Sequence, residues 1–168
     1  AQGRILANDI ISSMNVPQYN NSAVDGYAIK FTDLKKSNNI LSLIGKNSPG
    51  GTFKKLIPPL STLKVFTGSP VPQCFDTVVM HEDCKIRKLK IHFPNNINLG
   101  QNLRKEGEDI LKDNIILRKG KFLRPQDIGQ LASIGIKKVK TFIPLKIIIF
   151  STGNEILEPG EKNNIEKR

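Results

Sequence analysis

The sequence of 168 residues has no tryptophan and only two cysteines, and its longest purely aliphatic or aromatic run is residues 147–150. A membrane-spanning helix needs about 20 apolar residues, so we expect no membrane span. No signal-peptide pattern opens the sequence either. Cys74 and Cys84 form no C-x-x-C motif, and His81 and His92 lie too far apart to complete a short zinc clip. We therefore expect two reduced thiols in a cytoplasmic protein and no zinc site.

Acidic residues are few, and the formal net charge is +11. Such a charge suits an anion-binding surface, for example one for nucleic acid. Lysine nevertheless far outnumbers arginine, and both are scattered, as compositional drift in an A/T-rich genome would leave them. Only 6% of residues are aromatic, and they do not interleave with the basic residues as stacking platforms would. A basic nucleic-acid-binding β domain remains an alternative, but we expect no nucleic-acid partner.

Short strands dominate the pattern between residues 27 and 93. Five segments alternate apolar and polar residues or are β-branched, and Gly, Pro, Asn or Ser separate them. These segments are YAIKF (27–31), LSLIG (41–45), LKVFTG (63–68), DTVVMHE (76–82) and LKIHF (89–93). They predict a compact, turn-rich β unit.

One helix is predicted in RPQDIGQLASIGI, residues 124–136. Pro125 suits the first helical turn, Asp127 places negative charge near the positive helix end, and Gly135 suits the left-handed termination. Arg124 is a poor N-cap residue. Strands followed by a helix of this kind place the chain in the α+β class.

The two ends of the sequence give weaker signals. GRILANDII (3–11) reads as a helix tail running into a strand. Residues 147–150, IIIF, read as a strand buried on both faces that ends in a polar Ser-Thr-Gly turn. A turn of this kind begins a βα unit with a ligand site at the carboxyl end of the strand.

Four polar segments combine glycine with acids or hydroxyls: residues 21–26, 67–72, 102–110 and 151–155. Each alone is explained by turn chemistry, in which Asp25 or Asp109 merely caps a turn. Four in one chain favour an anion or metal–nucleotide site. Asp25, Glu108 and Asp109 are hard oxygen ligands that suit Mg²⁺ shared with phosphates, and Thr67 and its backbone neighbours offer neutral donors.

Several motifs in one order give these segments a family context. They are GRILANDI, VPQYNNSAVDGYAIK, VFTGSPVPQCFDTVVMHED, NLRKEGEDI, RPQDIGQLASIGI and KIIIFSTGNEI. This order resembles the molybdopterin molybdenumtransferases, the bacterial molybdenum insertases related to the E domain of gephyrin. Family members are considerably longer. The resemblance implies a mixed α/β first domain (1–19 and 101–144), an inserted β domain (20–100), and the leading strand of a truncated molybdopterin-binding α/β domain (145–168).

The resemblance also implies a reaction, in which molybdate is inserted into adenylylated molybdopterin with Mg²⁺ and AMP is released. It implies a homodimer, with molybdopterin adenylyltransferase as the pathway partner. We expect no insertion from these residues alone, because the downstream part of the site is absent from the sequence. A non-catalytic dimerising scaffold, a role that gephyrin's E domain also has, is the second alternative.

Site residues are carried over motif by motif. The resemblance implies that Asp25 and Asp109 are catalytic acids and Mg²⁺ ligands. It implies five substrate-binding residues: Ser22, Thr67, Gly68, Arg104 and Glu155. One departure stands after the PVP sequence, where the family usually has small residues including a glycine. Here Gln73, Cys74 and Phe75 follow, and Cys74 would be strained if that glycine supplied a positive φ.

Overall fold

The computed structural model describes residues 1–153 and residue 160. It contains mostly strands, with two short α-helices and one 3-10 turn, as the α+β class requires. The largest unit is a six-stranded sheet. In spatial order its strands are β6 (Thr77–Met80), β3 (Gly26–Ile29), β5 (Ser61–Val65), β4 (Ile40–Asn47), β8 (Lys90–His92) and β7 (Lys85–Arg87).

Neighbouring strands of this sheet are antiparallel, except that β4 and β5 are parallel and joined by a crossover. Each of the five predicted strand segments overlaps one strand, so the pattern located five of the six strands of this sheet and missed β7. The segment 27–31 was predicted to be a strand along its whole length, but the strand ends at Ile29. The last residue of the segment, Phe31, instead begins helix α1 (Phe31–Lys36), because the carboxylate of Asp76 accepts a hydrogen bond from the Phe31 N–H at 2.8 Å.

The middle of the sheet is buried on both faces, because successive side chains of its strands point to opposite faces, whereas β7 at one edge is exposed. Tyr27 and Ile29 of β3 pack in one hydrophobic cluster with Leu41 and Ile91. Ala28, between them, faces the other cluster. All four residues of β3 are buried. The turn before β3, which holds Asp25, is therefore anchored by a strand that is packed on both sides.

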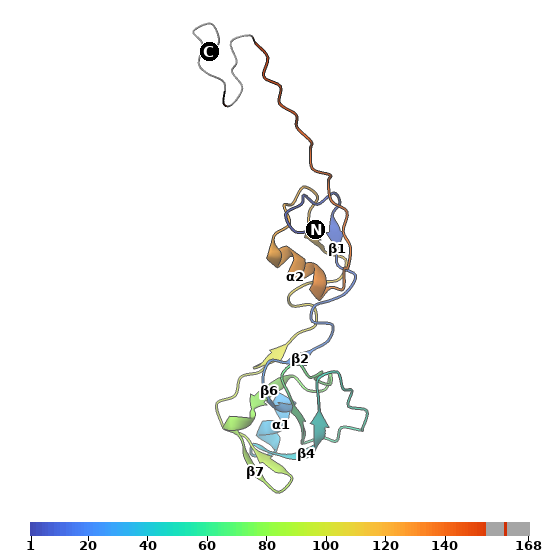
Figure 1. Ribbon diagram of the computed structural model, residues 1–168. Helices are drawn as coiled ribbons and strands as arrows, with labels where there is room; N and C mark the ends of the chain where they lie inside the picture. Colours follow the sequence, from blue (N-terminus) through green and yellow to red (C-terminus); the bar gives the residue numbers. More distant parts are fainter. Residues whose placement is uncertain (154–159, 161–168) are drawn as a thin grey trace.

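A separate hydrophobic cluster lies in the unit that holds β1 and α2, above the sheet in Figure 1. It is built from Leu6, Leu117, Leu123 and Leu131. Helix α2 (Pro125–Ser133), strand β1 (Ile10–Ile11) and strand β10 (Ile115–Leu117) surround it.

The predicted helix is confirmed as α2. Gly135 has φ +76°, and its N–H donates to the Ala132 carbonyl while the Ile136 N–H donates to that of Leu131. This is the Schellman termination that the sequence predicted. The poor cap at Arg124 is compensated because the Asp127 carboxylate accepts from the Arg124 N–H at 2.8 Å. None of the described helices is long and apolar enough to cross a membrane.

Two antiparallel segments join the unit of the six-stranded sheet to the unit that holds α2, forming the narrow link in Figure 1. Strand β2 (Asn21–Ser22) pairs with strand β9 (Leu103–Arg104), and Val16 forms an isolated bridge with Ile110. The Val16–Pro17 peptide bond is cis. Residues from the first predicted site segment thus lie directly beside residues from the third.

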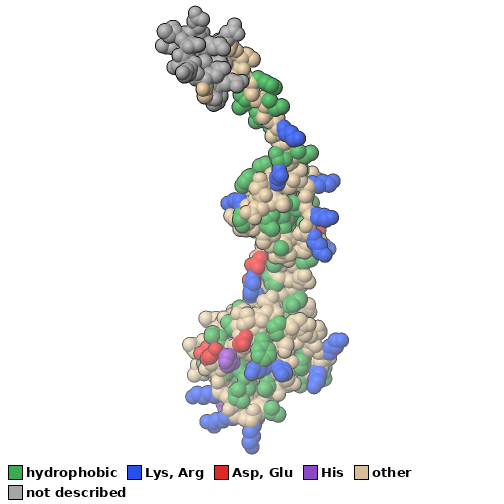
Figure 2. Space-filling view, in the orientation of Figure 1, with side chains coloured by type: hydrophobic (Ala, Val, Ile, Leu, Met, Phe, Trp, Pro, Cys, Tyr) green, Lys and Arg blue, Asp and Glu red, His purple; other side chains and the backbone are tan. Residues whose placement is uncertain are grey.

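Two predictions at the ends of the sequence are wrong. Residues 3–11 contain no helix tail, because Gly3 has φ +75° and the Leu6 N–H bonds to the distant carbonyl of Lys121, but the strand expected at the end of this segment is present as β1. Residues 147–150 form no strand and are 74–85% exposed, in the extended segment whose hydrophobic side chains Figure 2 shows in green. An isolated strand leaves its N–H and C=O groups unpaired. Within the described residues nothing pairs with this segment, so an apolar run alone does not make it a core strand.

Candidate functional site

Three of the four polar segments converge on β2. The loop after β5 lies on one side, where the Ser22 N–H donates to the Ser69 carbonyl at 3.0 Å and the Gly68 N–H donates to the Ser22 carbonyl at 2.8 Å. Strand β9, which carries Arg104, lies on the other side. The fourth segment is not brought to this site: Ser151 to Gly153 are exposed at the far end of the chain (Figure 1). Glu155 lies outside the described residues.

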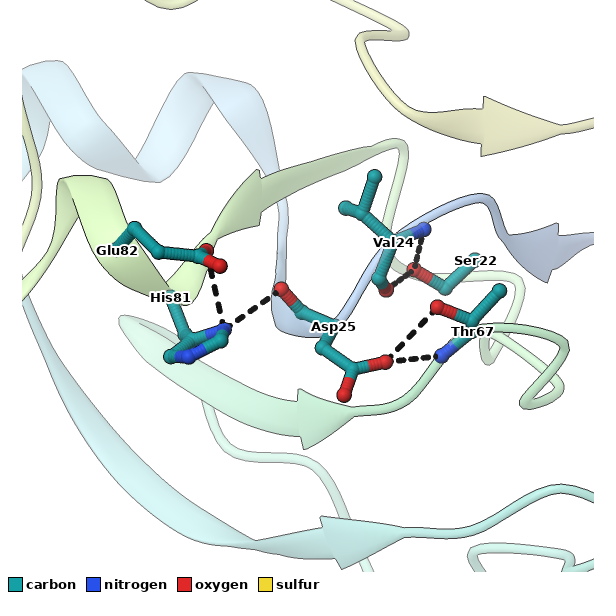
Figure 3. Close-up of polar contacts among 6 residues, drawn as sticks. All are labelled: Ser22, Val24, Asp25, Thr67, His81 and Glu82. Carbon is teal, nitrogen blue, oxygen red and sulfur yellow. Dashed lines mark hydrogen bonds and ion pairs between the residues drawn. The ribbon is translucent and has the colours of Figure 1, made fainter.

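Asp25 is held by Thr67 across 42 positions of sequence (Figure 3). Its Oδ1 accepts from the Thr67 N–H and from the Thr67 Oγ1–H, both at 2.8 Å. These two bonds, the backbone bond first, hold the pKa of the Asp25 carboxyl below its usual value. Asp25 is exposed, and Oδ2 makes no hydrogen bond within the described part of the chain. An ionised carboxylate oxygen is thereby presented to solvent in a fixed place.

Ser22 and Gly68 fix the backbone conformation around Asp25 and offer no free polar group for a substrate. Ser22 is buried, and its Oγ–H donates to the Val24 carbonyl at 2.6 Å, which fixes the turn ahead of Asp25. Gly68 has φ +79°, a conformation that costs a residue with a side chain about 1–2 kcal/mol. The N–H groups of Thr67, Gly68 and Ser69 all bond within this region. They are not the free anion donors that the sequence suggested.

Arg104 forms a second cluster with two acids of its own loop. Its Nε donates to Glu108 Oε1 at 2.7 Å and its Nη2 donates to Asp109 Oδ2 at 2.6 Å. Glu108 also accepts from the Lys105 N–H at 2.7 Å. Hydrogen bonding to Arg104 is the first cause of the lowered pKa of Glu108. Arg104 is therefore engaged by carboxylates, and a phosphate would have to share or displace them.

The two predicted acids, Asp25 and Asp109, belong to different clusters on either side of the β2–β9 pair. The described residues hold no group of three or more His, Cys, Asp or Glu side chains arranged to bind a metal ion. Mg²⁺ nevertheless commonly uses one or two carboxylates and takes its remaining ligands from water and substrate phosphates. A carboxylate with one free oxygen, such as that of Asp25, fits such an ion only in company with a phosphate.

Sequence reasoning missed His81 and Glu82, which directly follow β6 in the 3-10 turn His81–Asp83. His81 Nδ1 lies 3.2 Å from the Asp25 carbonyl oxygen and 3.1 Å from Glu82 Oε2. The segment DTVVMHE was assigned to a strand as a whole. The change from apolar Val79 and Met80 to polar residues was the signal that the strand had ended.

The departure after PVP introduces no strain. None of residues 73–75 has a positive φ. Phe75 is buried against the sheet, and Cys74 is exposed. The other cysteine, Cys84, is half-buried, and burial raises the pKa of its thiol to about 12. Both thiols are free, and Cys84 is a poor nucleophile because it stays protonated.

Comparison with known proteins assigns the chain, including these clusters, to a protein family. Residues 1–135 match the family described as the MoeA N-terminal region (domain I and II). The chain belongs to this family. Over 162 residues it is 40% identical to the molybdopterin molybdenumtransferase of Haemophilus influenzae, covering 96% of this chain and 40% of that protein.

Solved structures of MoeA proteins from Pyrococcus horikoshii agree. One has a TM-score of 0.76 and 37% identity, covering 83% of this chain and 38% of that one. Another has a TM-score of 0.81 and 31% identity, covering 99% of this chain and 44% of that one. The chain thus spans about 40% of the length of the curated relatives that it matches. The predicted resemblance is confirmed, and the chain corresponds to an N-terminal portion of such proteins.

Proposed function

We propose that the complete protein inserts molybdate into adenylylated molybdopterin and releases AMP. The observation that carries the proposal is the convergence of Asp25–Thr67 and Arg104–Asp109 on one strand pair. It lies within the region that matches the MoeA family. Mg²⁺ held by the free oxygen of Asp25 together with substrate phosphates would neutralise charge that develops on the leaving phosphate, and Asp109 would join as a second ligand only by releasing Arg104.

The chain's own residues have defined tasks in this proposal. Asp25 presents an ionised oxygen that can orient a metal ion or an attacking water. Thr67 fixes that oxygen's direction by holding the opposite one. Arg104 orients Glu108 and Asp109 and supplies positive charge near the bound phosphates. Ser22 and Gly68 shape the turn and loop that carry these groups, and we keep Glu155 as a substrate-binding residue outside the described part.

The domain organisation supports the same proposal. We propose that the cluster around Leu6 and Leu131 belongs to a first domain (1–19 and 101–144), and that the two clusters on the six-stranded sheet belong to an inserted β domain (20–100). Residues 145–168 would begin the molybdopterin-binding domain. We further propose an elongated cytoplasmic homodimer that receives its substrate from molybdopterin adenylyltransferase. Sedimentation of the complete protein at micromolar concentration should give a dimer, and a monomer would contradict this part.

The test of the function is molybdate-dependent AMP release by the complete protein in the presence of Mg²⁺. Asp109→Asn should keep the contact to Arg104 through its amide oxygen but lose the charge. We expect turnover to fall about 100-fold, on the scale of one lost electrostatic contact. Asp113→Asn, an exposed acid in the same loop, is the matched control and should be normal. Inactive wild type would contradict the proposal and favour the scaffold alternative, and equal turnover of both variants would contradict the assigned role of Asp109.

A further inference from the structure

Both the side-chain carboxylate and the backbone carbonyl of Asp25 are held by hydrogen bonds (Figure 3). Thr67 holds the carboxylate, as described above. At the other end the Asp25 carbonyl oxygen accepts from the His81 N–H at 3.1 Å and also lies 3.2 Å from His81 Nδ1. One carbonyl is therefore engaged by both the backbone and the imidazole of the same residue.

The surroundings of His81 determine which ring nitrogen carries hydrogen. Nδ1 faces two oxygen atoms, the Asp25 carbonyl and Glu82 Oε2, the latter at 3.1 Å. A carbonyl and a carboxylate are both acceptors, so Nδ1 must be the donor. Glu82 therefore sets the tautomer and the ring orientation in which Nδ1–H reaches Asp25.

Folding does not explain the imidazole contact. The side chain of His81 is 49% exposed and that of Glu82 is 58% exposed. Ion pairs at such exposed positions contribute little to stability. The β3–β6 pairing already reaches Gly26 and Met80, and the His81 N–H alone satisfies the Asp25 carbonyl at its end. The imidazole adds a second constraint at the residue whose carboxylate faces solvent.

We propose that His81 is a positioning residue for Asp25, with Glu82 holding the imidazole in place. The contact fixes the backbone of Asp25, and hence the direction in which its free carboxylate oxygen points. This inference rests on the proposed function for its consequence in catalysis. It concerns the geometry of Asp25 and requires no contact between His81 and substrate.

Three substitutions in the complete protein separate the possibilities. His81→Asn keeps an N–H donor near the position of Nδ1, His81→Gln moves the donor one carbon farther out, and His81→Leu removes it. We expect His81→Leu and His81→Gln to lower kcat for cofactor formation about 10- to 100-fold, the scale of a misplaced catalytic group. His81→Asn should restore most of the rate. His92→Leu, at the other histidine, is the control and should behave as wild type.

The KM for adenylylated molybdopterin should change less than about threefold, because an effect on positioning falls on kcat. Melting temperatures should match wild type in all variants. Wild-type kcat in His81→Leu, or His81→Asn as slow as His81→Leu, would overturn the proposal.

Hydrogen exchange at the Thr67 amide gives a readout that needs no substrate. That N–H donates to Asp25 Oδ1, so it reports how well Asp25 is held. His81→Leu should speed its exchange about tenfold by local opening, and His81→Asn should restore protection. Unchanged exchange in His81→Leu would overturn the proposal about His81. If wild type forms no cofactor, the proposed function fails, while this measurement still decides the role of His81.

Discussion

Gly26 permits the close approach of strands β3 and β6 beside Asp25, so Gly26→Ala tests the packing that supports the site. A Cβ atom there would lie 2.1 Å from the Val79 carbonyl oxygen and 2.9 Å from its carbonyl carbon. Cβ atoms essentially never approach other atoms within 3.0 Å, so the strands would have to separate by about 0.9 Å. The obstructing atoms are backbone and cannot rotate away. We expect a loss of about 1–3 kcal/mol, the usual cost of overpacking.

The control is Gly129→Ala in α2. Gly129 is exposed, nothing lies within 4 Å of its Cβ position, and alanine in a helix interior should stabilise by about 0.5–1 kcal/mol. Near-UV circular dichroism during thermal unfolding reports the sheet through Tyr27, which is 1% exposed and packs edge-on against Phe93. In a domain of the proposed size, residues 20–100, each kcal/mol shifts the melting temperature by roughly 4–8 °C. A Gly26→Ala protein as stable as wild type would refute the packing argument.

Two further predictions concern α2. Gly135→Ala should destabilise by about 1–2 kcal/mol, since φ is +76° there, and chemical denaturation beside Gly129→Ala measures the difference. Asp127 has a pKa below the ordinary value of 3.8, first because it accepts from the Arg124 N–H. The folded state therefore favours the carboxylate, and its contribution to stability is present above pH 3.8 and lost as pH falls through the lower folded pKa. Stability measured from pH 6 to pH 2 should fall less steeply in Asp127→Asn than in wild type, and identical slopes would contradict the assignment.

Local signals predicted the elements that depend on local chemistry. The five alternating or β-branched segments became strands because successive side chains of a strand point to opposite faces of a sheet, and β-branched residues fit its pleated surface. Helix α2 was readable because Pro125 and Gly135 act within one turn of its ends. Helix α1 was missed because Asp76, which bonds to its first N–H, lies 45 positions away. The run 147–150 misled for the related reason that burial requires a partner, which sequence alone does not supply.

The candidate site shows the same division. Composition and turn chemistry identified the segments around Asp25, Thr67 and Arg104. Their meeting at β2 depends on pairings between distant parts of the chain, such as Asn21 with Arg104. The same limit hid His81, whose contact with Asp25 arises from the β3–β6 register. For the same reason the sequence did not reveal that the N–H groups of residues 67–69 bond within the protein and are not free to bind an anion.

The most direct test of the central claim, that the charge of Asp25 acts in catalysis, is the single-turnover rate of AMP release by Asp25→Asn in the complete protein. The amide oxygen can still accept both Thr67 bonds, so the melting temperature should stay at the wild-type value. Asp9→Asn is the matched control, because Asp9 is also exposed and its Oδ1 accepts from a backbone N–H, that of Lys119. The account predicts a rate about 100-fold below that of Asp9→Asn. Equal rates in the two variants would contradict it and leave Asp25 as a residue that only stabilises its turn.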